Sequence, residues 1–285
     1  MKEFDKFLDS RGIDQQCKIR KRDSSLSNSE VMSILILFHL SGFRELKNFY
    51  IKHVKKYYTK EFPGLVSYNR FVELQKNTIL PMIYFLLKSK TGEATGISFV
   101  DSTPIKVCNN RRIHSNRVFR GYAERGHSSI GYFYGFKLHL VINDKGEILS
   151  FMITKGNVDD REPLKNENFI KKIFGKLFGD KGYISKDLKQ MLFVDGINLI
   201  TKLKKNMKGE PLSVSDKVLL RKRAVIESVN DELKNICQIE HTRRRSFANF
   251  FANLLSGLIS YAYRDKKPSL KLNLVENDDY QLTLF

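Results

Sequence analysis

The 285-residue sequence contains few cysteines: Cys17, Cys108 and Cys237, which lie far apart. No Cys-x-x-Cys pair and no cysteine–histidine cluster accompanies them, so the sequence supports neither a disulfide framework nor a structural zinc site. Isolated cysteines of this kind are typical of a reducing compartment, and we expect a cytoplasmic protein.

Long hydrophobic runs are also missing. The N-terminal stretch MKEFDKFLDSRGIDQQ contains acidic residues and no apolar segment, unlike a secretory signal peptide. The two most apolar segments, residues 31–40 and 247–263, are too short or too interrupted by Asn and Ser to span a membrane, which takes roughly 20 apolar residues. We therefore expect no membrane partner.

Acidic residues are scarce relative to basic ones. The chain has 50 Lys and Arg against 31 Asp and Glu, so its net charge is 50 − 31 = +19. Residues 1–95 carry 17 basic and 10 acidic side chains, and residues 96–285 carry 33 and 21, so the excess is not confined to a tail. A positive field of this extent concentrates polyanions, and nucleic acid is the first partner class to consider.

Residues 1–95 have the pattern of a helical domain. The N-cap signature Ser27-Asn28-Ser29-Glu30 precedes an apolar run, and apolar side chains recur at helical spacing in residues 46–58 and 68–90. Lysines alternate with the aromatics of these segments, which fits DNA binding. A role in packing or dimerisation fits equally well, so the sequence leaves both roles open.

A short Gly-rich linker, residues 92–96, separates this domain from a region that alternates strands and helices. The predicted strands are 97–101, 132–143, 147–154, 176–180 and 197–203, and the predicted helices are 160–172, 185–194, 215–234 and 247–263. An antiparallel hairpin followed by strand–helix alternation predicts a mixed α/β fold, with a five-stranded mixed sheet flanked by helices in the ribonuclease-H-like order. We expect this domain to cover residues 96–265, with a tail at 266–285.

Two aspartates end predicted strands of this sheet. Asp101 follows Ile-Ser-Phe-Val and precedes Ser-Thr-Pro, which we expect to stop the strand, and Asp180 follows Lys-Leu-Phe-Gly. If the two strands are parallel neighbours, both carboxylates meet at the carboxyl edge of the sheet. Adjacent carboxylates repel one another unless a cation lies between them, and hard oxygen ligands favour Mg²⁺ or Mn²⁺.

A third carboxylate, Glu227, lies on the predicted helix 215–234. Arg223 precedes it by four residues and Lys234 follows it by seven, so a row of cation, carboxylate and cation covers about 16 Å of one helix face at about 1.5 Å per residue. Val218, Val225, Val229 and Leu233 share the opposite face. Taken alone, the polar row is explained as well by a solvated face with an i,i+4 ion pair.

The stretches ISFVDST, YFYGFKLHLVIN, ITKGNVDDREPL, FGDKGY and RxxxExxxxxxK, in this order, resemble the catalytic domain of bacterial insertion-sequence transposases of the DDE superfamily. The resemblance covers about residues 97–263. It implies that Asp101, Asp180 and Glu227 are the catalytic, metal-binding triad of a ribonuclease-H-like domain. One position departs from the family signature, because Leu220 stands where the signature has Tyr.

The resemblance also implies a reaction and its partners. Two Mg²⁺ ions, or Mn²⁺, would support cleavage at the element ends by water and strand transfer by a DNA 3′-OH, without a covalent enzyme intermediate. The partners would be double-stranded DNA, as terminal inverted repeats and as target, with a homodimer on DNA.

Several basic or aromatic residues are candidate DNA contacts. They are Arg223 and Lys234 of the helix, Lys181 and Tyr183 of the FGDKGY stretch, Arg111 and Arg112 of the basic insertion 106–125, and Arg243, Arg244 and Arg245. Each of the loop arginines also fits a solvated loop. We interpret Asp159 and Asp160 as helix-capping residues rather than metal ligands, and His139 as an ordinary strand residue.

Two alternatives remain open from the sequence. A ribonuclease-H-like nuclease that cuts without joining would share the three carboxylates. A catalytically silent relative would bind DNA only, although uncompensated carboxylates on a DNA-binding face are unfavourable unless they hold metal.

Overall fold

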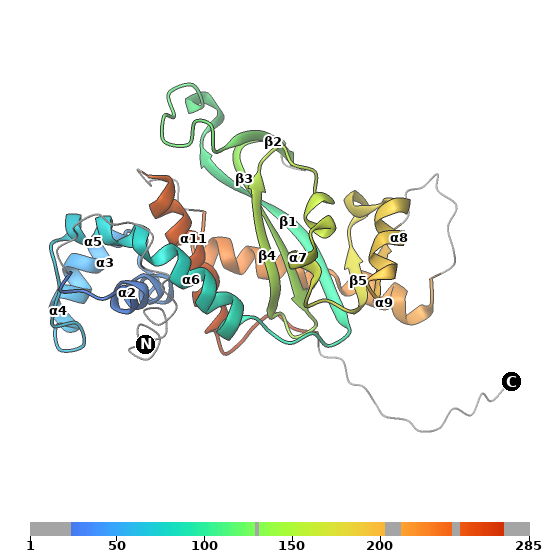
Figure 1. The fold of residues 1–285 in the computed structure, drawn as a ribbon, viewed down its shortest axis with the longest axis horizontal. Coiled ribbons are helices and arrows are strands. Elements are labelled where there is room, and N and C mark those ends of the chain that lie inside the picture. The colour runs from blue at the N-terminus through green and yellow to red at the C-terminus, as the bar shows by residue number, and fades with distance from the viewer. Residues whose placement is uncertain (1–23, 129–130, 203–211, 241–245, 271–285) are drawn as a thin grey trace, which may run out of the picture.

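The computed structural model describes residues 24–128, 131–202, 212–240 and 246–270. Its strands are β1 (Ile97–Cys108), β2 (Glu124–Ser128), β3 (Gly131–Asn143), β4 (Ile148–Lys155), β5 (Gly175–Gly179) and β6 (Ile197–Thr201). They form one mixed sheet (Figure 1). The predicted mixed α/β fold with a helical N-terminal region is confirmed.

The sheet combines an antiparallel and a parallel half. β3 pairs antiparallel with β1, β2 and β4, whereas β5 pairs parallel with β1 and β6. The five predicted strands are all present in the order β4-β3-β1-β5-β6, and the short strand β2 is additional. β1 and β5 are therefore the parallel neighbours that the two aspartates require.

The expectation that Ser-Thr-Pro stops the first strand is wrong, because β1 continues through Pro104 to Cys108. The reason lies in the pairing: β5 pairs with β1 only from Ile97 to Phe99, so within the described residues one edge of β1 has no neighbouring strand beyond that point. Proline lacks an N–H and is tolerated on such an edge. The N–H of Lys106, two residues further along, donates to a side chain, Glu240 Oε1 at 2.9 Å.

Helices cover both faces of the sheet. Those after β1 are η4 (Asn110–Arg112), η5 (Glu162–Lys165), α7 (Glu167–Ile170), η6 (Lys181–Tyr183), α8 (Lys186–Val194), α9 (Val214–Lys222), α10 (Ala224–Asp231), η7 (Glu232–Ile236) and α11 (Phe247–Ala262), where η marks a 3-10 or π-helical turn. Side chains of β1 alternate between the faces: Phe99 packs in the core that includes α10 and α11, and Val100 in the core that includes α7 and α8.

The predicted helix 215–234 is present as three consecutive elements: α9 and α10 meet at Arg223, and η7 follows α10 directly at Glu232. Val225, Val229 and Leu233 are buried as expected, but Val218 is 41% exposed. The junction at Arg223 interrupts the regular helix, so the apolar face of α10 does not extend along α9 in register. The predicted helix 160–172 is also divided, into η5 and α7.

The N-terminal region is helical as predicted. Its elements are α2 (Asn28–Leu40), α3 (Leu46–Phe49), η1 (Tyr50–Val54), α4 (Lys55–Tyr57), α5 (Tyr68–Leu74), η2 (Gln75–Thr78), α6 (Ile79–Phe85) and η3 (Leu86–Lys90). α11, from the far end of the described chain, packs against α2 and α6, and Phe250 of α11 stacks on Phe136 of β3 with ring centroids 5.4 Å apart. In Figure 1, α11 lies between these helices and the sheet. No described helix combines the length and hydropathy needed to cross a membrane.

Candidate active site

Sheet register brings the two predicted aspartates to the same edge. Phe99 of β1 is the register partner of Phe178 of β5, and Asp101 and Asp180 each follow two residues later. Asp180 ends its strand and caps η6, where its Oδ1 accepts a hydrogen bond from the Gly182 N–H at 2.8 Å. The two aspartates thus lie close together where the parallel ladder of β1 and β5 ends, but only Asp180 follows the end of its strand, because β1 continues past Asp101 to Cys108.

Glu227 reaches the same place from α10. Asp101, Asp180 and Glu227, together with Arg223, line one cavity of about 360 Å³, which we call the acidic cavity. α10 packs against β1, and its apolar side chains, including Val225, are buried in the same core as Phe99 of β1. The polar face of the helix consequently lies beside the end of β5.

Asp101 is more enclosed than Glu227, since its side chain is 20% exposed and that of Glu227 is 58% exposed. The Asn230 amide donates to its Oδ2 at 3.0 Å, and Arg223 Nη1 lies 3.6 Å from its Oδ1. Burial raises the pKa of Asp101 to about 7; the Arg223 guanidinium opposes this rise, and the negative charges of Asp180 and Glu227 add to it. The ionised form of Asp101 is therefore favoured by additional positive charge in the cavity.

Arg223 supplies part of that charge. Its Nη2 lies 2.6 Å from Glu227 Oε1, the i,i+4 ion pair expected from the sequence, while its Nη1 faces Asp101. The side chain is only 18% exposed. One guanidinium therefore links two of the three predicted catalytic carboxylates.

The donor set of the acidic cavity fits a hard divalent cation, because carboxylate oxygens are the ligands that Mg²⁺ and Mn²⁺ prefer. The side chains are not, however, already arranged around a metal position. Within the described ranges, no three His, Cys, Asp or Glu side chains are grouped so that they could hold a metal ion. Arg223 lies beside Asp101 and Glu227, so binding there requires its side chain to move from between them.

A fourth carboxylate, Asp160, also lines the acidic cavity, a position that the sequence did not predict. Its Oδ1 accepts hydrogen bonds from Lys137 Nζ and from Ser102 Oγ, both at 2.8 Å. Asp159 pairs instead with Arg161 at 2.7 Å. The interpretation of both aspartates as helix caps is wrong, because η5 begins only at Glu162 and has no side-chain cap.

Tyr183 occupies a different environment from that of a DNA-stacking residue. It is 1% exposed and packs in the core that includes α8. Its hydroxyl is buried and has no hydrogen-bond partner in the part of the chain that the structure describes. Burial raises its pKa well above the usual value, and the charges of Asp101, Asp160 and Asp180 raise it further. Tyr183 therefore forms part of the buried wall of the acidic cavity.

The other predicted DNA contacts lie in separate places. Lys234 is 3.7 Å from Glu240 and is 23% exposed. Lys181 is exposed at the start of η6, and Arg111 and Arg112 are exposed on η4, in the green arm between β1 and β2 of Figure 1. Arg243, Arg244 and Arg245 lie outside the described residues.

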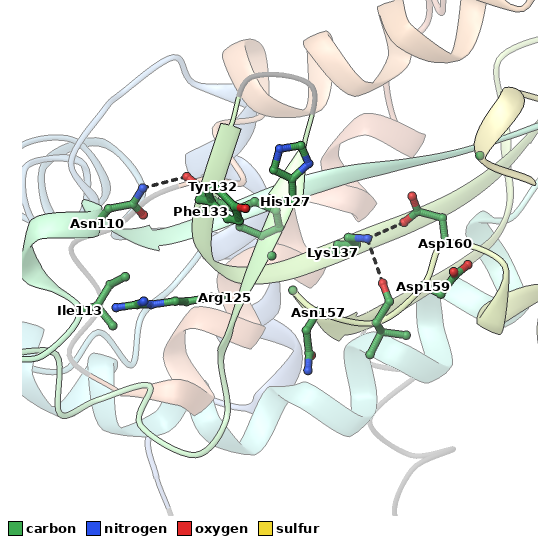
Figure 2. Close-up of a pocket in the computed structure, with 14 residues that line it drawn as sticks. Asn110, Ile113, Arg125, His127, Tyr132, Phe133, Lys137, Asn157, Asp159 and Asp160 are labelled. Atoms are coloured by element: carbon green, nitrogen blue, oxygen red, sulfur yellow. Dashed lines mark hydrogen bonds and ion pairs between the residues drawn. The ribbon is translucent and has the colours of Figure 1, made fainter.

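A second, larger cavity of about 850 Å³ adjoins the acidic cavity. Figure 2 shows it between the arm and β3, with Lys137 directed toward Asp160. The side chains that carry its chemistry are Asn110, Arg125, His127, Tyr132, Phe133, Lys137, Asn157 and Asp160. The two cavities share His127, Phe133, Lys137 and Asp160.

A family model described as a transposase DDE domain matches residues 91–247, more than half of the chain. The chain belongs to the DDE transposase family. This family carries out DNA phosphoryl transfer and generally uses a divalent metal ion, in agreement with the carboxylates of the acidic cavity.

Two solved transposase structures are similar over much of this DDE transposase. A piggyBac transposase synaptic complex with hairpin DNA is 11% identical, covers 88% of this chain and 68% of its own, and has a TM-score of 0.49. The Mos1 strand transfer complex is 10% identical, covers 90% and 82%, and has a TM-score of 0.24. A search of curated proteins finds no match. The family assignment comes from the sequence match alone.

Proposed function

We propose that this DDE transposase is encoded by an insertion sequence, cleaves DNA at the element ends in a metal-dependent reaction, and joins the released ends to target DNA by 3′-OH attack. Asp101, Asp180 and Glu227 are the catalytic, metal-binding residues in this proposal. The observation that supports it is that these three side chains, 126 positions apart in sequence from first to last (227 − 101), line one cavity with Arg223.

Each residue of the acidic cavity then has a distinct task. When bound, two Mg²⁺ ions, or Mn²⁺, would activate the attacking oxygen and stabilise the leaving oxygen. Asp101 and Asp180 would hold them from the sheet edge and Glu227 from α10, while Asn230 fixes the Asp101 carboxylate through its 3.0 Å hydrogen bond. Arg223, displaced from the carboxylates, would bind a phosphate next to the scissile bond.

DNA would extend beyond the acidic cavity over basic side chains. Lys181 lies next to Asp180, and Arg111 and Arg112 are exposed on the arm. In this proposal they and Lys234 contact phosphates of the terminal inverted repeat or of the target, which positions DNA without reading its sequence. Two ends must be processed together, so we propose a homodimer on DNA.

The triad assignment is tested by Asp101→Ala, Asp180→Ala and Glu227→Ala in an assay of Mg²⁺-dependent cleavage of a DNA fragment that carries the element end. We expect each variant to lose at least about 1,000-fold in rate and to retain DNA binding, because removal of one member of a catalytic group costs nearly as much as removal of all. Asp231→Asn is the matched control: Asp231 lies on α10 four residues beyond Glu227, where it accepts a hydrogen bond from Asn235. Undiminished cleavage by any triad variant would refute the assignment.

The two alternative functions are separated by the product. A transposase joins pre-cleaved ends to a supercoiled plasmid, whereas a nuclease of this fold leaves free ends only. A silent DNA-binding relative gives neither product at any Mg²⁺ or Mn²⁺ concentration.

A further inference from the structure

Lys137 and Asp160 form the charged pair among the four residues that line both cavities, the other two being His127 and Phe133. Lys137 of β3 and Asp160 line both cavities, and they are joined by a 2.8 Å ion pair. Lys137 is the register partner of Pro104 on β1, three residues beyond Asp101. A DNA strand that occupies both cavities would therefore lie close to the Lys137 ammonium.

Lys137 is held in place far more firmly than a surface lysine. Its side chain is 12% exposed, and Nζ donates to Asp160 Oδ1 and to the Val158 carbonyl, both at 2.8 Å. Figure 2 shows these two bonds fixing the end of the side chain. An ammonium group has three N–H bonds, so one donor has no acceptor among the described residues and is available to a ligand in the cavity.

Asp160 connects this cation to the catalytic edge. The same Oδ1 that binds Lys137 accepts a hydrogen bond from Ser102, the neighbour of Asp101 in β1. Two hydrogen bonds to Asp160, from Ser102 and from Lys137, therefore fix the ammonium relative to Asp101, the carboxylate expected to act on the scissile phosphate. A fixed donor at this place suits the next phosphodiester along the strand.

The larger cavity has room and chemistry for that strand. Its volume of about 850 Å³ lies within the range of ligand sites. The rings of His127 and Tyr132 lie edge to face with centroids 4.9 Å apart on one wall, and Arg125 is exposed on the rim. Aromatic walls bind bases by stacking, and a rim arginine binds phosphate.

We propose that Lys137, positioned by Asp160, is a phosphate-binding residue that carries the substrate strand from the acidic cavity into the larger cavity. Its ligand is the phosphodiester next to the scissile one. Asp160 is a positioning residue, since it acts through Lys137. The inference rests on the proposed function in that the substrate is a DNA strand cut at the acidic cavity.

The test is the salt dependence of DNA binding. The probe is a labelled duplex with a single-stranded extension and arbitrary sequence, measured by fluorescence anisotropy in EDTA over a series of NaCl concentrations. Each phosphate contact contributes about 0.7 to 0.9 to the slope of log K against log salt. We expect Lys137→Met to make the slope shallower by about 1 and to weaken binding, and Lys137→Arg to restore both.

The matched control is Lys155→Met. Lys155 lies on β4 and forms an ion pair with Glu124 at 3.8 Å, and it lines neither cavity. We expect its slope to equal that of the wild type. An unchanged slope for Lys137→Met, or an equal change in Lys155→Met, would overturn the proposal.

Asp160→Asn separates positioning from a purely structural ion pair. It removes a negative charge near the DNA, so we expect binding to hold or tighten, while the rate of end cleavage at saturating DNA falls about 10-fold or more because Lys137 is no longer fixed. A loss of binding and cleavage together, with a lower melting temperature, would show a structural role. If Lys137→Met unfolds, the double variant Lys137→Met/Asp160→Leu removes both charges and is measured in the same way.

The failure of this inference can be told from a failure of the proposed function. If wild-type protein does not cut element ends but Lys137→Met still makes the slope of log K against log salt shallower, the phosphate site is supported and the proposed reaction is refuted. If cleavage is normal and the slope is unchanged, only the phosphate site falls.

Discussion

The core around α11 and the acidic cavity are built on opposite principles. In α11, Leu254, Leu255, Leu258 and Ile259 are fully buried against the N-terminal helices and the sheet. The acidic cavity instead gathers four carboxylates and two cations at partial burial. Apolar burial stabilises the fold, whereas desolvated charges cost free energy unless they are paired. The first region should therefore determine stability and the second activity.

One helix joins the two regions. Val229 of α10 is fully buried in the α11 core, while the side chain of Glu227, two residues earlier, is 58% exposed. The packed core thus holds α10 in place, and the opposite face of this helix lines the acidic cavity. Substitutions on the two sides of α10 should separate folding from chemistry.

The largest effect on stability is expected in the core. Leu258→Ala removes a fully buried side chain and should lower the free energy of unfolding by about 3 to 5 kcal/mol. Urea denaturation followed by circular dichroism measures it, and Leu258→Met, which conserves volume, should cost less than about 1.5 kcal/mol. Cleavage per folded molecule should not change. A large loss of cleavage without a loss of stability would break the comparison.

The paired aspartates and Glu227 could be predicted from the sequence because their placement follows local rules. Asp101 and Asp180 each lie two residues beyond the last pair of the parallel β1–β5 ladder, so they lie close together although β1 itself continues to Cys108, and helical periodicity places Glu227 opposite the buried valines. These rules need only element type and order.

The partners of these residues could not be predicted in the same way. The pair of Lys137 with Asp160 depends on where the segment after β4 turns back over β3, and the pair of Lys234 with Glu240 depends on how the chain leaves η7. Neither follows from periodicity. The sequence suggests a helix cap at Asp160 because a polar segment follows it, but its carboxylate binds Lys137 of β3 and Ser102 of β1.

Protonation of a buried histidine should give the next effect. His139 of β3 is 1% exposed, and burial lowers its pKa to about 4; Lys137 lowers it as well, and Asp160 opposes them. In the unfolded chain the imidazole titrates near 6.5, so below that pH the unfolded state binds more protons and stability falls as the pH falls toward 4. His139→Gln should abolish about 2 kcal/mol of this dependence between pH 7 and pH 4.5.

The measurement for His139 is urea denaturation at pH 7 and pH 4.5 for both proteins. Carboxylates titrate over the same interval in wild type and variant, so the difference between them isolates the imidazole. If the free energy of unfolding changed equally with pH in wild type and variant, His139 would accept a proton in the folded protein as readily as in the unfolded one. A charge near the acidic cavity would then cost less free energy than burial predicts.

The smallest effect is expected at the start of α2, far from the cavity. Ser27 and Glu30 form a capping box, in which Ser27 Oγ accepts from the Glu30 N–H at 3.2 Å and Glu30 Oε2 accepts from the Ser27 N–H at 2.8 Å. Ser27→Ala should cost about 1 kcal/mol of stability, because it leaves a helix-end donor unsatisfied. Ser67→Ala, which removes the cap of α5, is the matched control without the reciprocal bond and should cost no more. Both caps belong to the packed helical region and not to the acidic cavity, so the rate of end cleavage and the salt dependence of DNA binding should stay at wild-type values. A change in either would mean that the helical region acts on DNA directly.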